Sequence, residues 1–220
     1  MCYTIPMKKT DKGQTLSILA SLYKDAKPAL HFTTPYELLV AVILSAQCTD
    51  ERVNIVTEKL FKQYSTPSAM VTLTQKELER YIFSCGFYRM KAEHILSASK
   101  DILEKFGGEV PSTIEELMTL AGVGKKTANV VYSVAFGGDA IAVDTHVFRV
   151  SNRLGLAKGS TPLAVEAGLC KAIPKEDWSK AHHWLIYHGR RVCHSQKPNC
   201  AECALFAYCD YAKNLKQKKK

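Results

Sequence analysis

The sequence predicts an all-α fold, and three features of the chain lead to that prediction. Helix-start signals recur along it, and apolar residues repeat behind them at helical spacing. No segment alternates apolar and polar residues over more than a few positions, and no Asn-Gly hairpin turn occurs. The best strand candidate, 140–143, is short and isolated. We therefore expect roughly ten helices of modest length.

The first helices are predicted from their capping signals. Thr34 precedes a proline and a capping-box glutamate, and residues 38–44 are apolar on every face, which predicts a helix buried all round. Thr74 and Glu77 form a second capping box, and Gly86 is the predicted end of that helix.

Later helices follow similar signals. Apolar residues recur at helical spacing in 89–107, and a Gly-Gly pair at 107–108 ends that segment. A third capping box begins at Thr113. The pair 161–162, Thr-Pro, opens a helix that ends before Pro174.

Composition limits the class of protein. The 220 residues are 46% apolar and 23% charged, so the chain is globular, in one large domain or two small ones. Its net charge of +9 favours a polyanionic partner. The N-terminus lacks a secretory signal, and the longest apolar run, 38–44, is too short to span a membrane. We expect a soluble intracellular protein without a membrane partner, whose basic tail, 213–220, is disordered.

A Gly-x-Gly turn lies between two helical patterns. Gly122 and Gly124 leave the backbone N–H groups at the start of the second helix unobstructed, and such groups bind phosphate. Lys125 and Lys126 add positive charge there, and Val123 is apolar. These neighbours favour a helix-hairpin-helix that grips the DNA backbone, although an ordinary helical hairpin is the alternative.

Lys126 and Asp144 are candidates for chemistry. A deprotonated lysine amine can attack sugar C1′ and form a Schiff base, but most lysines after a turn are merely solvated. Asp144 follows an apolar run eighteen positions later and could be the partner of Lys126. It could equally be a simple helix N-cap.

Eight cysteines are present, and four of them crowd into the last thirty residues. Their spacing is Cys-x6-Cys-x2-Cys-x5-Cys, at Cys193, Cys200, Cys203 and Cys209. Four thiolates so close in sequence can hold a zinc ion or an iron–sulfur cluster, and counting does not decide between them. Disulfides are disfavoured inside cells.

Together these motifs resemble the endonuclease III family of bacterial DNA glycosylases and abasic-site lyases, over nearly the whole chain. The resemblance is carried by the segments 44–50, 122–130 and 143–147 and by the four-cysteine spacing. It implies a helix-hairpin-helix glycosylase fold with a DNA-binding cleft between two helical domains, and a flipped-out base. The implied domains are a six-helix domain at 27–138, with its helix-hairpin-helix at about 113–136, and an iron–sulfur domain made of 1–26 plus 139–220, with its cluster loop at 193–209.

The resemblance also implies roles for individual residues. Lys126 matches the family's nucleophile and Asp144 its catalytic carboxylate, and the four cysteines match the ligands of a [4Fe-4S] cluster. Gln47 matches the residue that fills the gap left by the flipped nucleotide, and Phe87 stands where a leucine usually acts as a wedge. The remaining expected DNA contacts are Gly122, Val123, Gly124, Lys125, Thr127, His146, Arg149 and Arg191.

The expected function is base-excision repair of duplex DNA containing oxidised pyrimidines or abasic sites. The enzyme removes the base and cuts the strand on the 3′ side by β-elimination through a lysine Schiff base. We expect a monomer in the bacterial cytoplasm, associated with the nucleoid.

Two alternative functions remain to be compared with this one. Related monofunctional adenine glycosylases lack the lysine and carry a glutamate in the segment equivalent to 38–49, which here has no acidic residue. A non-catalytic helix-hairpin-helix DNA-binding module with a structural metal site is the other alternative.

Overall fold

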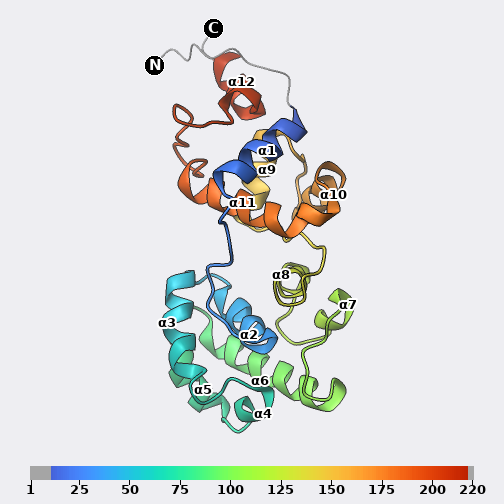
Figure 1. The fold of residues 1–220 in the computed structure, drawn as a ribbon. Helices are drawn as coiled ribbons and strands as arrows, with labels where there is room; N and C mark the ends of the chain where they lie inside the picture. Colours follow the sequence, from blue (N-terminus) through green and yellow to red (C-terminus); the bar gives the residue numbers. More distant parts are fainter. Residues whose placement is uncertain (1–10, 218–220) are drawn as a thin grey trace. The chain divides into compact units, whose positions relative to one another are not determined.

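The computed structural model describes residues 11–217, and it confirms the all-α fold (Figure 1). That part of the chain contains twelve α-helices, two short 3-10 turns and no strand. The elements are α1 (Lys12–Leu22), α2 (Pro35–Ser45), α3 (Asp50–Leu60), α4 (Pro67–Met70), α5 (Gln75–Ile82), α6 (Tyr88–Lys105), α7 (Ile114–Leu117), α8 (Lys125–Ala135), α9 (Thr145–Leu154), α10 (Pro162–Ala172), η1 (Lys175–Asp177), α11 (Trp178–Arg191), η2 (Phe206–Tyr208) and α12 (Asp210–Gln217). The strand candidate at 140–143 is buried but is not a β-strand.

The chain divides into two compact units. One is Pro28–Gly138, and the other combines the chain up to Lys27 with the chain from Asp139 onward. The first unit holds seven helices, α2 to α8, rather than the six that we expected. Two of the seven, α4 and α7, have only four residues each. Helix α4 begins because the Thr66 side chain accepts a hydrogen bond from the Ala69 N–H at 3.2 Å and Pro67 follows it.

The first unit is built around α2. Every residue of α2 from Tyr36 to Leu44 is buried, as its all-round apolar pattern predicts, and the helix packs against α3, α6 and α8. The Thr34 side chain caps it by accepting a hydrogen bond from the Glu37 N–H. The Glu37 carboxylate differs from the expected capping box, since it accepts from the N–H and hydroxyl of Thr33 at 2.6 and 2.7 Å.

The helix ends in this unit follow local turn chemistry. The capping box of Thr74 and Glu77 is present at α5. Gly86 does not end α5, because the helix stops at Ile82, where the Cys85 N–H folds back onto the Ile82 carbonyl at 2.8 Å. The Gly-Gly pair at 107–108 does follow the end of α6, and both glycines have positive φ.

The other unit packs α11 against α9 and α1. Its core contains buried side chains from α1, α9, α10 and α11 and from the segment that follows Cys193. Gly189 allows the close approach of α11 to α9, because a Cβ atom there would lie 2.9 Å from the His146 Nδ1 atom.

The C-terminal segment was expected to be disordered from residue 213, whereas residues 213–217 continue helix α12 in the structure. Ala212 is buried in the core of its unit, and the Lys213 ammonium lies 2.9 Å from the Asp210 carboxylate one turn earlier. The rest of the expected disordered tail, 218–220, lies outside the described residues.

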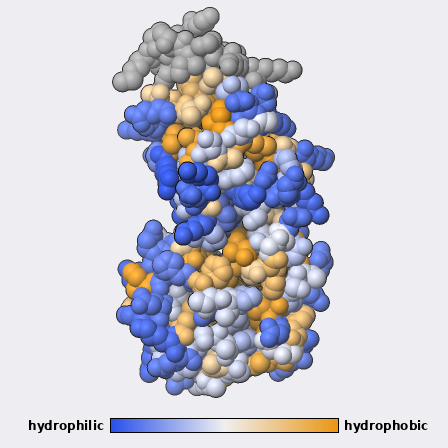
Figure 2. All heavy atoms as spheres, in the orientation of Figure 1, coloured by the Kyte–Doolittle hydropathy of each residue, from blue (hydrophilic) through white to orange (hydrophobic). Residues whose placement is uncertain are grey.

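The face of the molecule drawn in Figure 2 is largely hydrophilic. Figure 2 shows hydrophilic residues over much of the visible face, with separate apolar patches among them. Within residues 11–217, the helices are all too short or too polar to cross a membrane.

Candidate functional site

The turn between α7 and α8 requires glycine at its first position. Gly122 has a φ of +76°, and a Cβ atom there would lie 2.8 Å from the Nδ1 atom of His94 on α6. Leu120 and Val123 are buried on either side of it, and the Val123 N–H donates to the Leu120 carbonyl at 3.1 Å. The apolar residues therefore anchor the turn, and its glycines face outward.

The start of α8 is open to an anion. Gly124 is the N-cap and has no side chain that could satisfy the first N–H groups of the helix. Lys125 is half-buried and Lys126 is exposed, and both lie in the first turn of α8. Free amide donors, the positive end of the helix dipole and two ammonium groups thus gather at one place.

Asp144 is a helix N-cap, as one of its two interpretations predicted. Its Oδ1 atom accepts a hydrogen bond from the Val147 N–H at 2.7 Å, at the start of α9. The cap fixes the direction of the carboxylate at the end of the buried segment 140–143. This role is compatible with a catalytic one, because Oδ1 alone makes the cap. Lys126 belongs to one unit and Asp144 to the other.

Gln47 and Phe87 share an uncommon backbone conformation. Gln47 has a φ of +53° and Phe87 a φ of +58°, in the left-handed region that non-glycine residues seldom adopt. Both side chains are exposed, and Phe87 is 60% exposed, so ordinary core packing does not explain its ring. The two turns touch, since a Cβ atom on Gly86 would lie 3.5 Å from the Gln47 carbonyl oxygen.

Two more exposed apolar side chains lie within four residues of Phe87 in the chain, and the sequence alone did not single them out. Phe83 and Met90 are both exposed, although they are large and apolar. In the sequence, only their positions could have indicated them, since Phe83 lies four residues before Phe87 and Met90 three residues after it.

Three expected DNA contacts lie on α9 and α11. The Arg149 guanidinium donates to the Cys193 carbonyl and the Gly189 carbonyl, both at 3.0 Å, and lies 3.1 Å from the Nδ1 atom of His146. Burial lowers the pKa of His146. Arg149 therefore ties α9 to the start of the cysteine-rich loop. Arg191 is exposed, with its guanidinium 4.6 Å from the centre of the Tyr187 ring.

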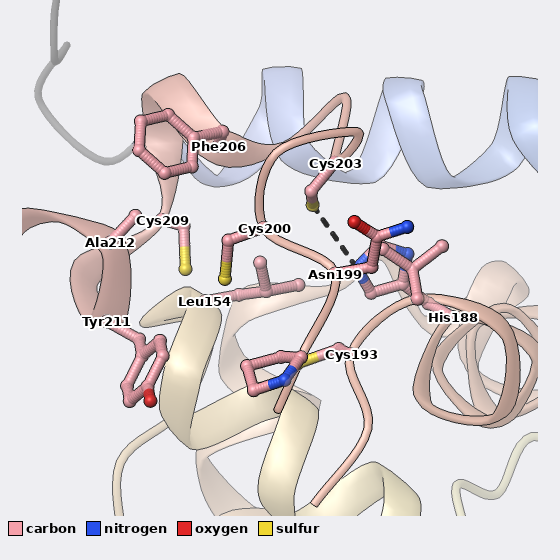
Figure 3. Close-up of a pocket in the computed structure, with 12 residues that line it drawn as sticks. Leu154, His188, Cys193, Asn199, Cys200, Cys203, Phe206, Cys209, Tyr211 and Ala212 are labelled. Carbon is pink, nitrogen blue, oxygen red and sulfur yellow. Dashed lines mark hydrogen bonds between the residues drawn. The ribbon is translucent and has the colours of Figure 1, made fainter. Parts of the chain in front are cut away.

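The four cysteines of the loop line one pocket (Figure 3). They share it with apolar side chains, including Leu154 and Phe206. Figure 3 shows the sulfur atoms of Cys200 and Cys209 turned to the same side, toward Leu154. Within residues 11–217, no three side chains of His, Cys, Asp or Glu converge closely enough to hold a single metal ion.

Arg153 holds this loop in place, and the sequence analysis missed it. Its guanidinium donates to the carbonyls of His194 and Ser195 at 2.6 and 2.8 Å and lies 3.5 Å from the Cys193 sulfur. The Arg153 carbonyl accepts from the Cys209 thiol at 3.2 Å. One residue therefore contacts both ends of the cysteine spacing. Its only signal in the sequence was its position one turn after Arg149 on α9.

A hydrogen-bonded chain leads from α1 to the loop. The Tyr23 hydroxyl lies 3.0 Å from the Nδ1 atom of His188, and the Nε2 atom of His188 lies 3.7 Å from the Cys203 sulfur. Burial lowers the pKa of His188 to about 4, so its ring is neutral at neutral pH and carries one N–H.

Burial favours the protonated thiol at three of the four loop cysteines. Burial raises the pKa of Cys203 to about 12, and it also raises the pKa values of Cys200 and Cys209. Metal ligation requires thiolates, so loading of the pocket must release protons.

Comparisons with known proteins agree with one another. The model of the family described as HhH-GPD superfamily base excision DNA repair protein matches residues 40–175. A curated relative from Synechocystis sp., named endonuclease III, is 50% identical over 206 residues, covering 93% of this chain and 94% of its own. The Bacillus subtilis protein of the same name is 51% identical over 195 residues, covering 88% and 89%. A solved structure of a trapped covalent intermediate between an endonuclease III and DNA matches with a TM-score of 0.89 at 48% identity, covering 94% of this chain and 99% of its own.

Proposed function

The chain belongs to the endonuclease III family of the HhH-GPD superfamily, and we propose that it is a bifunctional DNA glycosylase and abasic-site lyase. It acts in base-excision repair on duplex DNA that contains an oxidised pyrimidine or an abasic site. The observation that carries the proposal is the exposed amine of Lys126 in the first turn of α8, beside free backbone donors that fit a DNA phosphate. The similarity to a protein trapped covalently on DNA supports the same chemistry.

In the proposed reaction, the unprotonated amine of Lys126 attacks C1′ of the flipped nucleotide. The C1′–N bond breaks with its electron pair leaving on the base, which takes up a proton, and the amine loses its proton as the bond to C1′ forms. The sugar ring opens to give an imine, and loss of a C2′ proton expels the 3′ phosphate. Water then hydrolyses the imine and restores Lys126.

Asp144 is the proposed catalytic carboxylate. A negative charge near the sugar stabilises the positive charge that develops as the base leaves, and it assists proton transfer. Its hydrogen bond to the Val147 N–H supports this role, because the carboxylate is held in direction before the substrate binds.

The proposed DNA contacts have two kinds of support. The N–H groups and side chains of residues 122–127 bind the backbone phosphate, as the open N-terminus of α8 suggests. Gln47 fills the gap and Phe87 acts as the wedge, and their exposure on touching turns supports both roles. His146, Arg149 and Arg191 remain proposed contacts, although Arg149 already binds carbonyls of its own unit.

The four loop cysteines are the proposed ligands of a [4Fe-4S] cluster. Each corner of a four-iron cluster takes one thiolate, so the four cysteines that line one pocket supply a complete set of ligands for it. The similarity to the endonuclease III family favours the cluster over a zinc ion. When bound, the cluster supplies iron–thiolate bonds that hold the loop at 193–209 to the rest of its unit.

The remaining parts of the proposal concern organisation. We propose that 27–138 forms the domain carrying the lysine and that 1–26 with 139–220 forms the cluster domain. The protein acts as a monomer, in the cytoplasm beside the nucleoid.

A substrate panel tests the proposed function. Purified protein is incubated with duplexes that carry one oxidised pyrimidine, one abasic site or no lesion, and released base and cut strand are measured separately. We expect base release from oxidised pyrimidines and strand cutting at both kinds of lesion. A monofunctional glycosylase would release base without cutting, and a non-catalytic DNA-binding module would do neither.

Iron analysis tests the proposed cofactor. We expect yellow-brown protein with about four iron atoms per chain, as one four-iron cluster requires. Colourless protein with stoichiometric zinc, from cells supplied with iron, would contradict the cluster.

A further inference from the structure

Lys91 is a buried lysine with two short hydrogen bonds. It lies in the first turn of α6 and is only 3% exposed. Its ammonium donates to the carbonyls of Leu44 and Ala46, both at 2.7 Å. Those carbonyls lie at the C-terminal end of α2, one before and one after its last residue, Ser45.

The two carbonyls explain why an ammonium is stable there. The last carbonyls of a helix have no partner within the helix and carry the negative end of its dipole. No glycine ends α2, and Ala46 leaves the helix with a φ of −58° and a ψ of 113°, outside the helical region. Lys91 therefore supplies from another helix the cap that α2 lacks. Its remaining surroundings include the thiols of Cys48 and Cys85, and burial lowers its pKa.

The bonds of Lys91 reach both unusual turns. Its side chain holds the Ala46 carbonyl, and the next residue is the left-handed Gln47. Its backbone N–H donates to the carbonyl of the left-handed Phe87 at 3.1 Å. A single residue thus joins the turn that presents Gln47 to the turn that presents Phe87.

We infer that Lys91 is a positioning residue for lesion recognition, which holds the Gln47 turn in its left-handed conformation against the start of α6 before DNA binds. Gln47 can then enter the gap left by a flipped nucleotide without first being ordered, so less conformational entropy is lost on binding. This inference rests on the proposed function, since it takes Gln47 as the residue that fills the gap.

The test is a double-mutant cycle on DNA discrimination. The variants are Lys91→Met, Gln47→Ala and the pair of them, with Lys100→Met as the matched control, because Lys100 is exposed on the same helix. Affinity is measured for a duplex with a reduced abasic site and for an intact duplex, and the ratio of the two reports discrimination. Measurements are made well below each variant's melting temperature, so a general loss of stability does not change the ratio.

We expect Lys91→Met to lower discrimination about tenfold and to cost almost nothing further in the Gln47→Ala background, because the residues act through one contact. Lys100→Met should leave discrimination unchanged. If Lys91→Met does not fold, Lys91→Gln takes its place, because the shorter, uncharged glutamine amide keeps a donor group. We then expect the same loss of discrimination, but a smaller one.

Three results would overturn the inference. The first is unchanged discrimination in the Lys91 variant that is measured, and the second is an equal loss with and without Gln47. The third is no effect of Gln47→Ala alone, because the gap-filling role then fails and the inference fails with it. Failure of the proposed function is seen separately, as a wild-type protein that neither releases base nor cuts an abasic strand.

Discussion

At the scale of single residues, several side chains in this protein have both a structural and a proposed chemical task. Asp144 caps α9 and is the proposed catalytic carboxylate. Gly122 prevents a clash between the turn and His94 and belongs to the proposed phosphate-binding turn. Neither task excludes the other, because a cap fixes one oxygen of a carboxylate and leaves the other available.

The ring of Phe87 allows a test of a single residue. Phe87→Ala should weaken binding of an abasic duplex by about 1–3 kcal/mol, the usual contribution of a stacked base. Its melting temperature should hardly change, because the ring is 60% exposed. Fluorescence binding and thermal melts measure the two effects. Phe206→Ala is the control, since that ring is 2% exposed and its loss should cost about 3–5 kcal/mol of folding stability. A large fall in the melting temperature of Phe87→Ala would rule out the wedge.

Sequence and structure agree at residues whose role is local, and they diverge where distant residues meet. Three features could be predicted from adjacent residues alone, and the structure contains all of them. They are the caps at Thr74 and Thr161 and the Gly-Gly pair at 107–108. Lys91 and Arg153 could not be identified in this way, because their acceptors lie more than forty positions away. Their role exists only once two elements have packed.

At the scale of elements, the loop at 193–209 depends on α9 for its shape. Arg153 binds two carbonyls of the loop, and Arg149 binds the Cys193 carbonyl where the loop begins. The spacing of the four cysteines suggests them as ligands, but it does not reveal the helix whose arginines bind their loop. Local sequence was also insufficient at α5. Gly86 was the expected end of this helix, but the helix ends at Ile82.

Removal of the Arg153 side chain should loosen the cluster. In Arg153→Ala the carbonyls of His194 and Ser195 lose their donors, so we expect faster loss of visible absorbance when an iron chelator is added. Lys180→Ala is the control, because Lys180 is exposed and makes only a 3.5 Å ion pair with Asp177. Equal rates of iron loss in both variants would show that Arg153 does not hold the loop.

At the scale of the whole molecule, the fold consists of two units, each with its own hydrophobic core. The proposed nucleophile begins a helix in one of them, and the proposed carboxylate begins a helix in the other. The all-α class was predictable because helix periodicity and caps are local signals. The division into units was expected only from the family resemblance, since no linker composition marks it in the sequence.

The stability of the molecule should fall in acid through His183. Burial, with His182 beside it, lowers the pKa of His183 to about 3. In the unfolded chain His183 becomes protonated below about pH 6.5. In the folded chain it becomes protonated only near pH 3. The free energy of unfolding should therefore decrease as the pH falls through this window, by up to about 1.4 kcal/mol per pH unit from this residue.

Melting temperatures of wild-type and His183→Asn protein between pH 7 and pH 5 measure this effect. The variant should lose less stability than wild type over the window, whereas His194→Asn, at an exposed position, should follow wild type. Parallel curves for wild type and His183→Asn would show that His183 is not the sensitive group.

The central claim is that one of two adjacent lysines forms a bond to the DNA sugar. Neighbouring residues on a helix point about 100° apart, so Lys125 and Lys126 cannot both face the same C1′. In the first turn of α8, Lys126 is exposed and Lys125 is half-buried.

Borohydride trapping on an abasic duplex compares Lys126→Ala, Lys125→Ala and wild type. Lys126→Ala should give no covalent complex while keeping much of its DNA affinity. Lys125→Ala should still be trapped, with a salt dependence of binding reduced by about one unit of slope. Trapping of Lys126→Ala at near wild-type yield, or loss of trapping only in Lys125→Ala, would contradict the account.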